Sequence, residues 1–382
     1  MRVSILSESF DPNKGYLEYY LARELTRLKS DVKIFTFQRR RDILECQVDG
    51  FRVIRIPPFL DFHGYNLFTL RKASRMIKIL KEEPLEIVHC QPLFSPLSLF
   101  SMTLERAFNY GIVGSLITGE LSVGRLPARL EFDSVRFLVK KYVDRKTDVV
   151  FALSDDVRNL LFDMFHVSLD KIHVVPLGAD HILFRFNPET RRRTRDSLGL
   201  SRDDLVIVYT GKIIPSKQLD LLVKALASLK SIDKSVKLLF IGDGPLAYVD
   251  WLKKLAKSMG VHNRMVFHSS VHRTKLPEYY SASDIGVWPG SPSISILEAM
   301  SSGLPVVIRR SFVSNCELEY GNGFSFDHSD LSALISCLHR LISDEELRAE
   351  MGKRSRALVE DKLNWRKIAI TYLGLYKMAY EK

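Results

Sequence analysis

A predicted strand over 284–288 is followed by a loop broken by prolines and then by residues that can bind an anion. Ser295 and Glu298 have the spacing of a capping box, so we expect a helix to begin close to Ser293. The first backbone amides of that helix, near Ile294, favour negative charge such as that of phosphate. Open α/β sheets bind ligands at the carboxyl ends of their strands. The stretch therefore predicts an anion-binding site that includes Ser293, Ile294 and Ser295.

The elements around this loop follow the pattern of doubly wound parallel sheets. The predicted helix ends at Gly303, Pro305 prevents its continuation, and a strand resumes at 306–308. Strand and helix patterns alternate along both halves of the chain, which indicates an α/β fold. The predicted strands are 3–6, 32–37, 50–56, 86–90, 113–118, 149–153, 172–175, 205–209, 236–241, 265–267, 284–288 and 306–308. The predicted helices begin at residue 17 and after Ser154, and cover 67–81, 219–229, 248–259, 276–281 and a segment from 344 onward.

Length and composition are those of a globular protein. The chain has 382 residues, enough for about two domains, and we expect the boundary within 179–187, continuing into the charged segment 191–193. Hydrophobic residues make up 46% and charged residues 26%, and no apolar run is long enough to span a membrane. The first ten residues lack the pattern of a signal peptide, so we expect a cytoplasmic location. The four cysteines are far apart, which argues against a disulfide framework or a metal cluster.

The net charge of +11 predicts an anionic neighbour. Two basic, apolar-rich stretches, 67–81 and 125–146, can lie against an anionic membrane surface, or they can be packed helices with a solvated face. We expect the first alternative, with the protein peripheral on the cytoplasmic face of the membrane. Basic and aromatic residues are not interleaved as in a strand-binding groove, so nucleic acid is not an expected partner.

Five segments resemble the retaining GT-B glycosyltransferases of family 4, also described as glycosyl transferases group 1. In chain order they are VVPLGAD (174–180), VYTGKIIPSKQLDLLVKAL (208–226), LLFIGDGPL (238–246), LPEYYSASDIGVWP (276–289) and SISILEAMSSGLPVV (293–307). They cover most of the C-terminal half, whereas the N-terminal half matches loosely. The resemblance implies an N-terminal acceptor-side Rossmann-like domain at 1–183 and a C-terminal domain at 184–364 that binds a nucleotide-sugar. It also implies a terminal helix, 365–382, that crosses back to the first domain.

The resemblance assigns roles to residues that line the donor. Lys212 and Lys217 align with a basic pair that contacts the pyrophosphate, and Glu298 aligns with the glutamate that binds the ribose hydroxyls. A carboxylate can accept two hydrogen bonds from a vicinal diol, but Glu298 could instead serve only the capping box. The resemblance also implies donor contacts from the loops that hold Gly15, Gly242, Gly244 and Val271, and from the helix start at Ser293, Ile294 and Ser295.

One expected glutamate is missing. The family's first glutamate holds the transferred sugar, and counting back from Glu298 by the family's spacing gives Gly290. The loop is also shorter than usual, so Ser291, Ser293, Glu317 or Glu319 could take that role. Gly119 stands where many family members have a histidine near the donor sugar, with Glu120 as its nearest polar neighbour. His89 ends a predicted strand, and we interpret it as a core residue.

These observations predict an enzyme that moves a sugar from a nucleotide-sugar to a lipid-linked or other glycan acceptor with retention of configuration. The leaving nucleoside diphosphate needs fixed donors or a metal, and the sequence has no Asp-x-Asp pair, so we expect neither a metal nor another cofactor. The alternatives are an enzyme of the same architecture with other chemistry, such as a sugar-nucleotide epimerase, or a nucleotide-binding protein that does not catalyse transfer.

Overall fold

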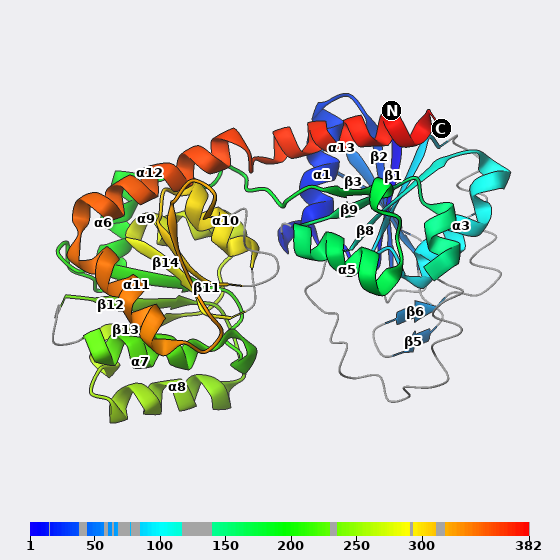
Figure 1. Cartoon of the computed structure of the whole chain (residues 1–382). Helices are drawn as coiled ribbons and strands as arrows, with labels where there is room; N and C mark the ends of the chain where they lie inside the picture. Colours follow the sequence, from blue (N-terminus) through cyan, green and yellow to red (C-terminus); the bar gives the residue numbers. More distant parts are fainter. Residues whose placement is uncertain are drawn as a thin grey trace, which may run out of the picture. The chain divides into compact units, whose positions relative to one another are not determined.

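The computed structural model describes residues 1–14, 16–37, 44–56, 60–62, 65–67, 77, 85–116, 140–229, 235–290, 293–310 and 318–381. Contacts within the chain divide it into two compact units. Unit 1 comprises Met1–Leu177 and Trp365–Lys382, and unit 2 comprises Gly178–Asn364. Each unit has its own sheet and its own helices (Figure 1).

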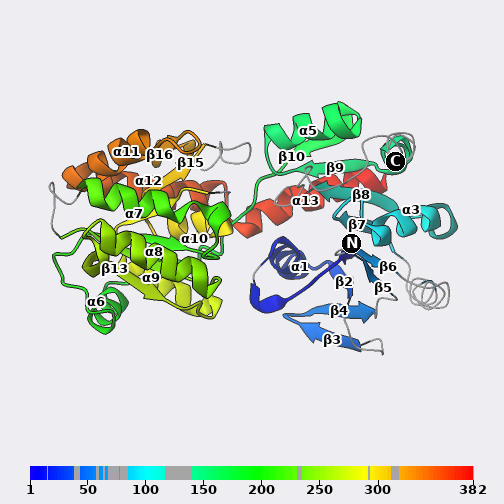
Figure 2. The same ribbon diagram turned by 90° about the horizontal axis from the view of Figure 1, so that it is seen from below.

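The sheet of unit 1 has the strand order β10-β9-β8-β7-β1-β2-β4-β3 (Figure 2). Neighbouring strands pair in parallel except β3, which runs antiparallel to β4 at the edge. The strands are β1 (Arg2–Ser7), β2 (Asp31–Phe37), β3 (Leu44–Val48), β4 (Phe51–Ile56), β7 (Ile87–Gln91), β8 (Gly111–Leu116), β9 (Val149–Ala152) and β10 (Ile172–Val174). The strands predicted in this half are confirmed. The edge strand β3 and the separate pair β5 (Leu60–Phe62) and β6 (Tyr65–Leu67) are additional.

Helices cover both faces of this sheet, which is why its inner strands are buried along nearly their whole length. Helices α1 (Leu17–Arg27) and α13 (Trp365–Tyr380) lie against each other, and α3 (Pro96–Phe108) packs on the opposite face of β7 and β8 (Figure 2). Helix α5 (Asp155–Phe165) follows β9 and begins at the predicted cap, because Ser154 Oγ accepts a hydrogen bond from the amide of Val157 at 3.3 Å. Short 3-10 turns occur at Pro12–Lys14 and Leu169–Lys171.

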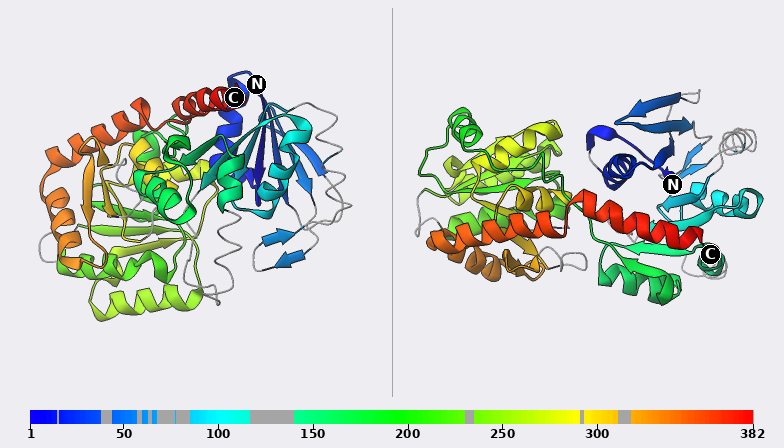
Figure 3. Two further views of the ribbon diagram at one scale, coloured as in Figure 1. Left: turned by 45° about the vertical axis from the view of Figure 1, so that its right-hand side comes forward. Right: turned by 90° about the horizontal axis from the view of Figure 1, so that it is seen from above.

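Helix α13 supplies aromatic rings to the core of unit 1, although it follows all of unit 2 in the sequence (Figure 3). Trp365 stacks on Tyr20 with 5.0 Å between ring centroids, and Tyr372 stacks on Phe151 at 4.0 Å. Aromatic pairs of this kind contribute about 0.5–1.5 kcal/mol beyond the burial of their surface. The packing of α13 is therefore part of the fold of unit 1.

Unit 2 contains a fully parallel sheet of the order β13-β12-β11-β14-β15-β16. The strands are β11 (Val206–Thr210), β12 (Lys237–Ile241), β13 (Met265–His268), β14 (Ile285–Trp288), β15 (Val306–Arg309) and β16 (Gly323–Phe326). Numbered along the chain, this is the order 3-2-1-4-5-6 of Rossmann sheets, in which the direction of winding reverses between the first and fourth strands. The loops after β11 and β14 therefore lie side by side at the carboxyl ends of these strands, where the direction of winding reverses.

Two layers of helices enclose this sheet. Helices α7 and α8 lie below it in Figure 1, and α6, α9, α10 and α12 lie above it, while α11 packs against α7, β15 and β16. Their bounds are α6 (Pro188–Ser197), α7 (Leu219–Leu229), α8 (Leu246–Ser258), α9 (Leu276–Ala282), α10 (Ile294–Ser301), α11 (Leu331–Ser343) and α12 (Glu345–Asp361). The predicted helices 219–229, 248–259 and 276–281 are confirmed to within two residues.

The charged segment 191–193, expected at the domain boundary, lies instead in helix α6 of unit 2. Arg191 and Arg195 of this helix bind the two carboxylate oxygens of Asp284, at 2.6 and 2.8 Å. Arg195 is buried and donates further hydrogen bonds to backbone carbonyls, including that of Ala282 at 2.9 Å. Asp284 in turn accepts from the amide of Val206 at 2.7 Å, so these contacts fix the starts of β11 and β14.

Most of the two basic stretches lies outside the described residues. Of 67–81, only Leu67 at the end of β6 and Ile77 are described, and of 125–146 only 140–146, which are helical. Among the described residues, no helix combines the length and apolar content needed to cross a membrane.

Candidate functional site

The candidate site lies in unit 2, where the loops after β11 and β14 meet at the reversal of the strand order. Lys212 follows β11, and Lys217 ends the 3-10 turn Pro215–Lys217 that precedes α7. Gly290 follows β14, and a Cβ atom built on it would lie 2.4 Å from Cα of Lys217. The two loops are therefore in direct backbone contact, and the position at Gly290 has no room for a side chain.

Three basic residues gather at this edge. Burial, together with the nearby charges of Lys212 and Arg309, lowers the pKa of Lys217 from its usual value. Arg309 ends β15, and its Nη1 lies 2.8 Å from Nδ1 of His328 in the loop after β16. Such a concentration of positive charge at the carboxyl ends of parallel strands suits an anionic ligand.

Arg309 was not predicted from the sequence. The signal was present, because 306–308 was predicted as a strand and Arg309 follows it directly. The missing information was the pairing of β15 beside β14, which brings Arg309 to the same edge as Gly290 and Lys217.

The two glycines predicted to line the donor hold the lysine-bearing loop in place. A Cβ atom at Gly242 would lie 1.9 Å from the carbonyl oxygen of Gly211, and one at Gly244 would lie 1.8 Å from that of Ile213. The amide of Ile213 donates to the carbonyl of Asp243 at 2.9 Å. The loop after β12 thus packs closely on the loop that carries Lys212 and Lys217.

The next loop along the sheet edge, after β13, carries Val271. The hydroxyl of Ser270 donates to Oδ2 of Asp243 and its amide donates to Oδ1 at 3.1 Å, and these hydrogen bonds lower the pKa of the Asp243 carboxyl. The predicted donor-binding residues Gly242, Gly244 and Val271 therefore lie on adjoining loops beside the lysines.

Helix α10 begins at Ser293, whose Oγ accepts a hydrogen bond from the amide of Ser295 at 3.4 Å. Ile294 and Ser295 form its first turn, as predicted. The helix ends in a Schellman motif, with Gly303 at a φ of 83° and the amide of Leu304 donating to the carbonyl of Ala299 at 3.1 Å. The predicted helix stop is confirmed.

The capping box predicted for Ser295 and Glu298 is wrong. Glu298 is only 2% exposed, and its Oε1 accepts a hydrogen bond from Nε of Arg273 at 3.1 Å. Its Oε2 lies 3.3 Å from the hydroxyl of Tyr280, which is itself 2.8 Å from Oγ1 of Thr210. Burial raises the pKa of Glu298, and the neighbouring Arg273 opposes that shift. Sequence reasoning missed Arg273 and Tyr280 because both belong to an earlier helical segment.

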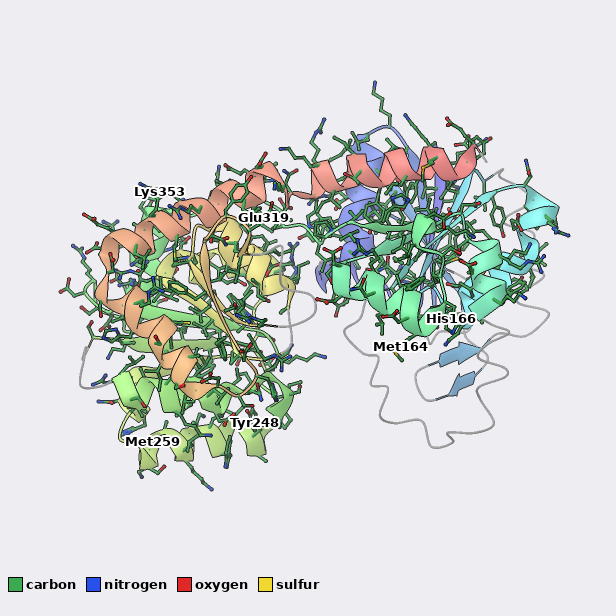
Figure 4. All side chains as sticks on the ribbon, viewed as in Figure 1. Met164, His166, Tyr248, Met259, Glu319 and Lys353 are labelled. Carbon is green, nitrogen blue, oxygen red and sulfur yellow. The ribbon has the colours of Figure 1, made fainter. Side chains whose placement is uncertain are left out.

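The residues that could replace the missing glutamate lie in different parts of the structure. Glu319 (Figure 4) precedes β16, so it lies at the amino ends of the parallel strands, whereas the lysines follow their carboxyl ends. It forms an ion pair with Lys362. It cannot hold a ligand bound beside Lys217, so that alternative is wrong. Ser291 and Glu317 lie outside the described residues, as do Gly15, Gly119 and Glu120. Ser293 is at the site, as the cap of α10.

The core interpretation of His89 is confirmed. Its ring is fully buried in unit 1, with Nδ1 2.7 Å from the hydroxyl of Tyr376 and Nε2 3.1 Å from Oγ of Ser115. Burial lowers the pKa of His89 to about 3, so the ring is neutral at physiological pH.

Unit 1 has its own reversal of strand order, between β1 and β7, and polar residues gather there. Glu18, in the first turn of α1, is buried and accepts a hydrogen bond from Oγ of Ser7 at 3.0 Å. Burial raises the pKa of Glu18. Gln91, at the end of β7, is also buried there. This polar cluster lies at the reversal point of the unit 1 sheet, as the basic residues lie at that of the unit 2 sheet.

The chain has two Rossmann-like units, and the second carries basic residues at the carboxyl ends of its strands. Two such units make up the GT-B class of glycosyltransferase folds. The family model described as "Glycosyl transferases group 1" matches residues 190–358, and that described as "Glycosyltransferase Family 4" matches residues 18–182. The chain thus belongs to the family 4, or group 1, glycosyltransferases.

Relatives and solved structures agree with this assignment. A GDP-mannose-dependent alpha-(1-6)-phosphatidylinositol monomannoside mannosyltransferase of Mycolicibacterium smegmatis is 26% identical over 378 residues, covering 95% of this chain and 94% of the relative. An alpha-monoglucosyldiacylglycerol synthase of Streptococcus pneumoniae is 25% identical over 320 residues, covering 80% and 70%. Among solved structures, Anabaena HepE in complex with UDP has a TM-score of 0.77 at 18% identity, covering 99% of this chain and all of the other.

Proposed function

We propose that the protein transfers a sugar from a nucleotide-sugar donor to a lipid-linked or other glycan acceptor, with retention of configuration and without a metal ion. The observation that carries this proposal is the position of Lys212 and Lys217 beside the start of α10, at the reversal point of the unit 2 sheet. The relatives named above support a lipid-linked acceptor, because their printed names specify a phosphatidylinositol mannoside and a glucosyldiacylglycerol.

The reaction requires stabilisation of a leaving diphosphate. The bond between the anomeric carbon and the diphosphate oxygen breaks, and a bond forms between that carbon and the acceptor oxygen. With retention, the acceptor adds on the face that the diphosphate leaves, so a diphosphate oxygen can take the acceptor's proton. The ammonium groups of Lys212 and Lys217 and the first amides of α10 would hold the negative charge that develops.

The other predicted donor contacts follow from the loops around these lysines. Gly242 and Gly244 let the loop after β12 support the loop that carries Lys212, and Val271 lies on the next loop, where the nucleotide base would bind. Glu298 would accept hydrogen bonds from the ribose hydroxyls through the lone pairs that Arg273 and Tyr280 leave available. Gly15 of unit 1 is the remaining proposed contact.

The test combines nucleotide binding with transfer. Isothermal titration with UDP and GDP is run beside a transfer assay with a panel of nucleotide-sugars and a membrane lipid extract, with and without EDTA. The proposal predicts nucleotide binding and EDTA-resistant transfer to lipid, with the anomeric configuration of the donor kept in the product. Nucleotide binding without transfer to any fraction would instead identify a binding protein on a transferase scaffold.

Membrane binding is a separate part of the proposal. The net charge of +11 would attract the protein to the cytoplasmic face of an anionic membrane, where a lipid-linked acceptor lies. Sedimentation with anionic and with neutral vesicles tests this, and binding to anionic vesicles should weaken as salt is raised. Equal recovery with both kinds of vesicle would refute it.

A further inference from the structure

Arg309 occupies the edge of the site where a sugar-binding carboxylate was expected. Trp288 of β14 pairs with Ile308 of β15, so Arg309 lies beside the residues that follow β14, which include Gly290. A side chain at Gly290 would collide with the backbone of Lys217, at 2.4 Å from its Cα and 2.8 Å from its carbonyl oxygen. The acidic group is thus absent from this position, and a guanidinium lies next to it.

The surroundings of Arg309 show that its side chain belongs to the site. Its Nη1 lies 2.8 Å from Nδ1 of His328, and the next residue, Ser329, accepts a hydrogen bond from Nε2 of Gln218 at 3.1 Å. Gln218 directly follows Lys217, so the loop after β16 joins Arg309 to the lysine-bearing loop. Nε of Arg309 is buried and has no hydrogen-bond partner among the residues that the structure describes. A buried donor of this kind is costly unless a ligand satisfies it.

Two ammonium groups suffice to balance the two negative charges on the diphosphate of a bound nucleotide-sugar. Lys212 and Lys217 already face the place proposed for the diphosphate, and the amides of α10 add to them. Arg309 is a third cation on the side of Gly290. A neutral sugar, which offers only hydroxyl groups, would leave the charge of this guanidinium unmatched. A carboxylate would match it and accept two parallel hydrogen bonds from it.

On the basis of the proposed function, we infer that Arg309 is a specificity-determining residue that binds a carboxylate on the transferred sugar, so the preferred donor is a nucleoside diphosphate uronate. The carboxylate takes no part in the bond changes at the anomeric carbon. It orients the sugar ring. The family's first glutamate would have this role, but Gly290 stands in its place.

The test compares matched donors that differ only in the acidic group. Affinities for UDP-glucose and UDP-glucuronate, for GDP-mannose and GDP-mannuronate, and for UDP and GDP alone are measured by isothermal titration. The wild-type protein should bind the uronate of the matching base at least about tenfold more tightly than the hexose, as one charge-assisted bidentate contact permits. Arg309→Gln should bring that ratio close to one while changing the affinity for the free nucleoside diphosphate by less than about threefold.

Arg310→Gln is the matched control. Arg310 is the next residue, its guanidinium is exposed, and it pairs with Asp327 at 3.6 Å, so removing its charge should leave the ratio unchanged. Equal wild-type affinity for uronate and hexose would overturn the inference and leave the proposed function intact. A loss of free nucleoside diphosphate binding in Arg309→Gln would overturn it too, by assigning Arg309 to the diphosphate. Failure of the wild-type protein to bind UDP or GDP would count against the proposed function itself.

Discussion

Arg273 and Glu298 form an ion pair inside unit 2, with Nε of Arg273 3.1 Å from Oε1 of Glu298. Both side chains are largely buried, and the Arg273 guanidinium also lies over the ring of Phe184, 5.0 Å from its centroid. Pairing holds the Glu298 carboxylate in one orientation while the hydroxyl of Tyr280 contacts its other oxygen. A carboxylate fixed in this way is prepared to receive a ligand without reorganising.

Glu298→Gln should destabilise unit 2 as well as weaken nucleotide binding. The substitution leaves the buried charge of Arg273 without its counter-ion, and breaking a buried pair costs about 3–5 kcal/mol. Denaturant unfolding of the variant measures this cost. Glu278→Gln is the control, because Glu278 pairs with the exposed Lys275 and its loss should change the free energy of unfolding by less than about 0.5 kcal/mol. If Glu298→Gln unfolds like wild type, the ion pair has no structural role.

Lys217→Ala should lower the transfer rate by roughly 10²–10³, because the leaving diphosphate loses one fixed positive donor. Lys212 is more exposed than Lys217, so Lys212→Ala should have a smaller effect. Turnover is compared with that of Lys257→Ala, which removes an exposed lysine from the last turn of α8, the helix that leads to the amino end of β13. Unchanged turnover in a folded Lys217→Ala protein would remove this lysine from the mechanism.

Gly290→Ala should lower turnover by about 10²-fold, the cost of a misplacement of about 1 Å at a catalytic site. The added methyl group would lie 2.4 Å from Cα of Lys217, so the loop must shift and carry the ammonium group with it. Gly374→Ala in α13 is the control, because nothing lies within 4 Å of its added methyl group. Alanine at this exposed helical position should stabilise unit 1 by about 0.5–1 kcal/mol. Wild-type turnover in Gly290→Ala would show that the contact with Lys217 is not needed.

His89 should make unit 1 sensitive to acid. Its folded-state pKa of about 3 is below the usual unfolded value of about 6.5, so its contribution to stability is complete above pH ~6.5. That contribution is lost as the pH falls toward 3, and amounts to roughly 4–5 kcal/mol over the whole window. The unfolding free energy of wild type minus that of His89→Gln should therefore decrease from pH 7 to pH 4. In the control His262→Gln, which changes an exposed histidine, a constant difference is expected. A constant difference for His89→Gln would contradict the predicted protonation.

Periodic apolar patterns predicted most of the strands and helices such as α1 and α7, whereas α3, α11 and β16 were not predicted. Helix α6 was missed because its sequence, PETRRRTRDS, is almost wholly polar, and its place depends on the pairing of Arg191 and Arg195 with Asp284 far along the chain. Strand β3 was missed because it is a largely exposed edge strand.

Residues of the candidate site could be predicted where they lie on loops that follow recognisable strands. The start of α10 was found in this way, and Lys212 and Lys217 were found because the loop that carries them resembles that of the family's basic pair. The partners of Glu298 were not predicted. A capping box is a local pattern, and it does not show that Arg273 binds the same carboxylate. The closeness of Gly290 to Lys217 and of Arg309 to both depends on strand order, which no single segment encodes.

The position of α13 has a consequence for how the protein is made. A ribosome synthesises the strands of unit 1 first, then all of unit 2, and only afterwards the residues that stack on Tyr20 and Phe151. Until then the nascent unit 1 carries an uncovered aromatic face, which is a site for chaperone binding or aggregation. A chain that stops before Trp365 keeps that face exposed permanently, so a premature stop codon there would impair the folding of the unit that was synthesised first.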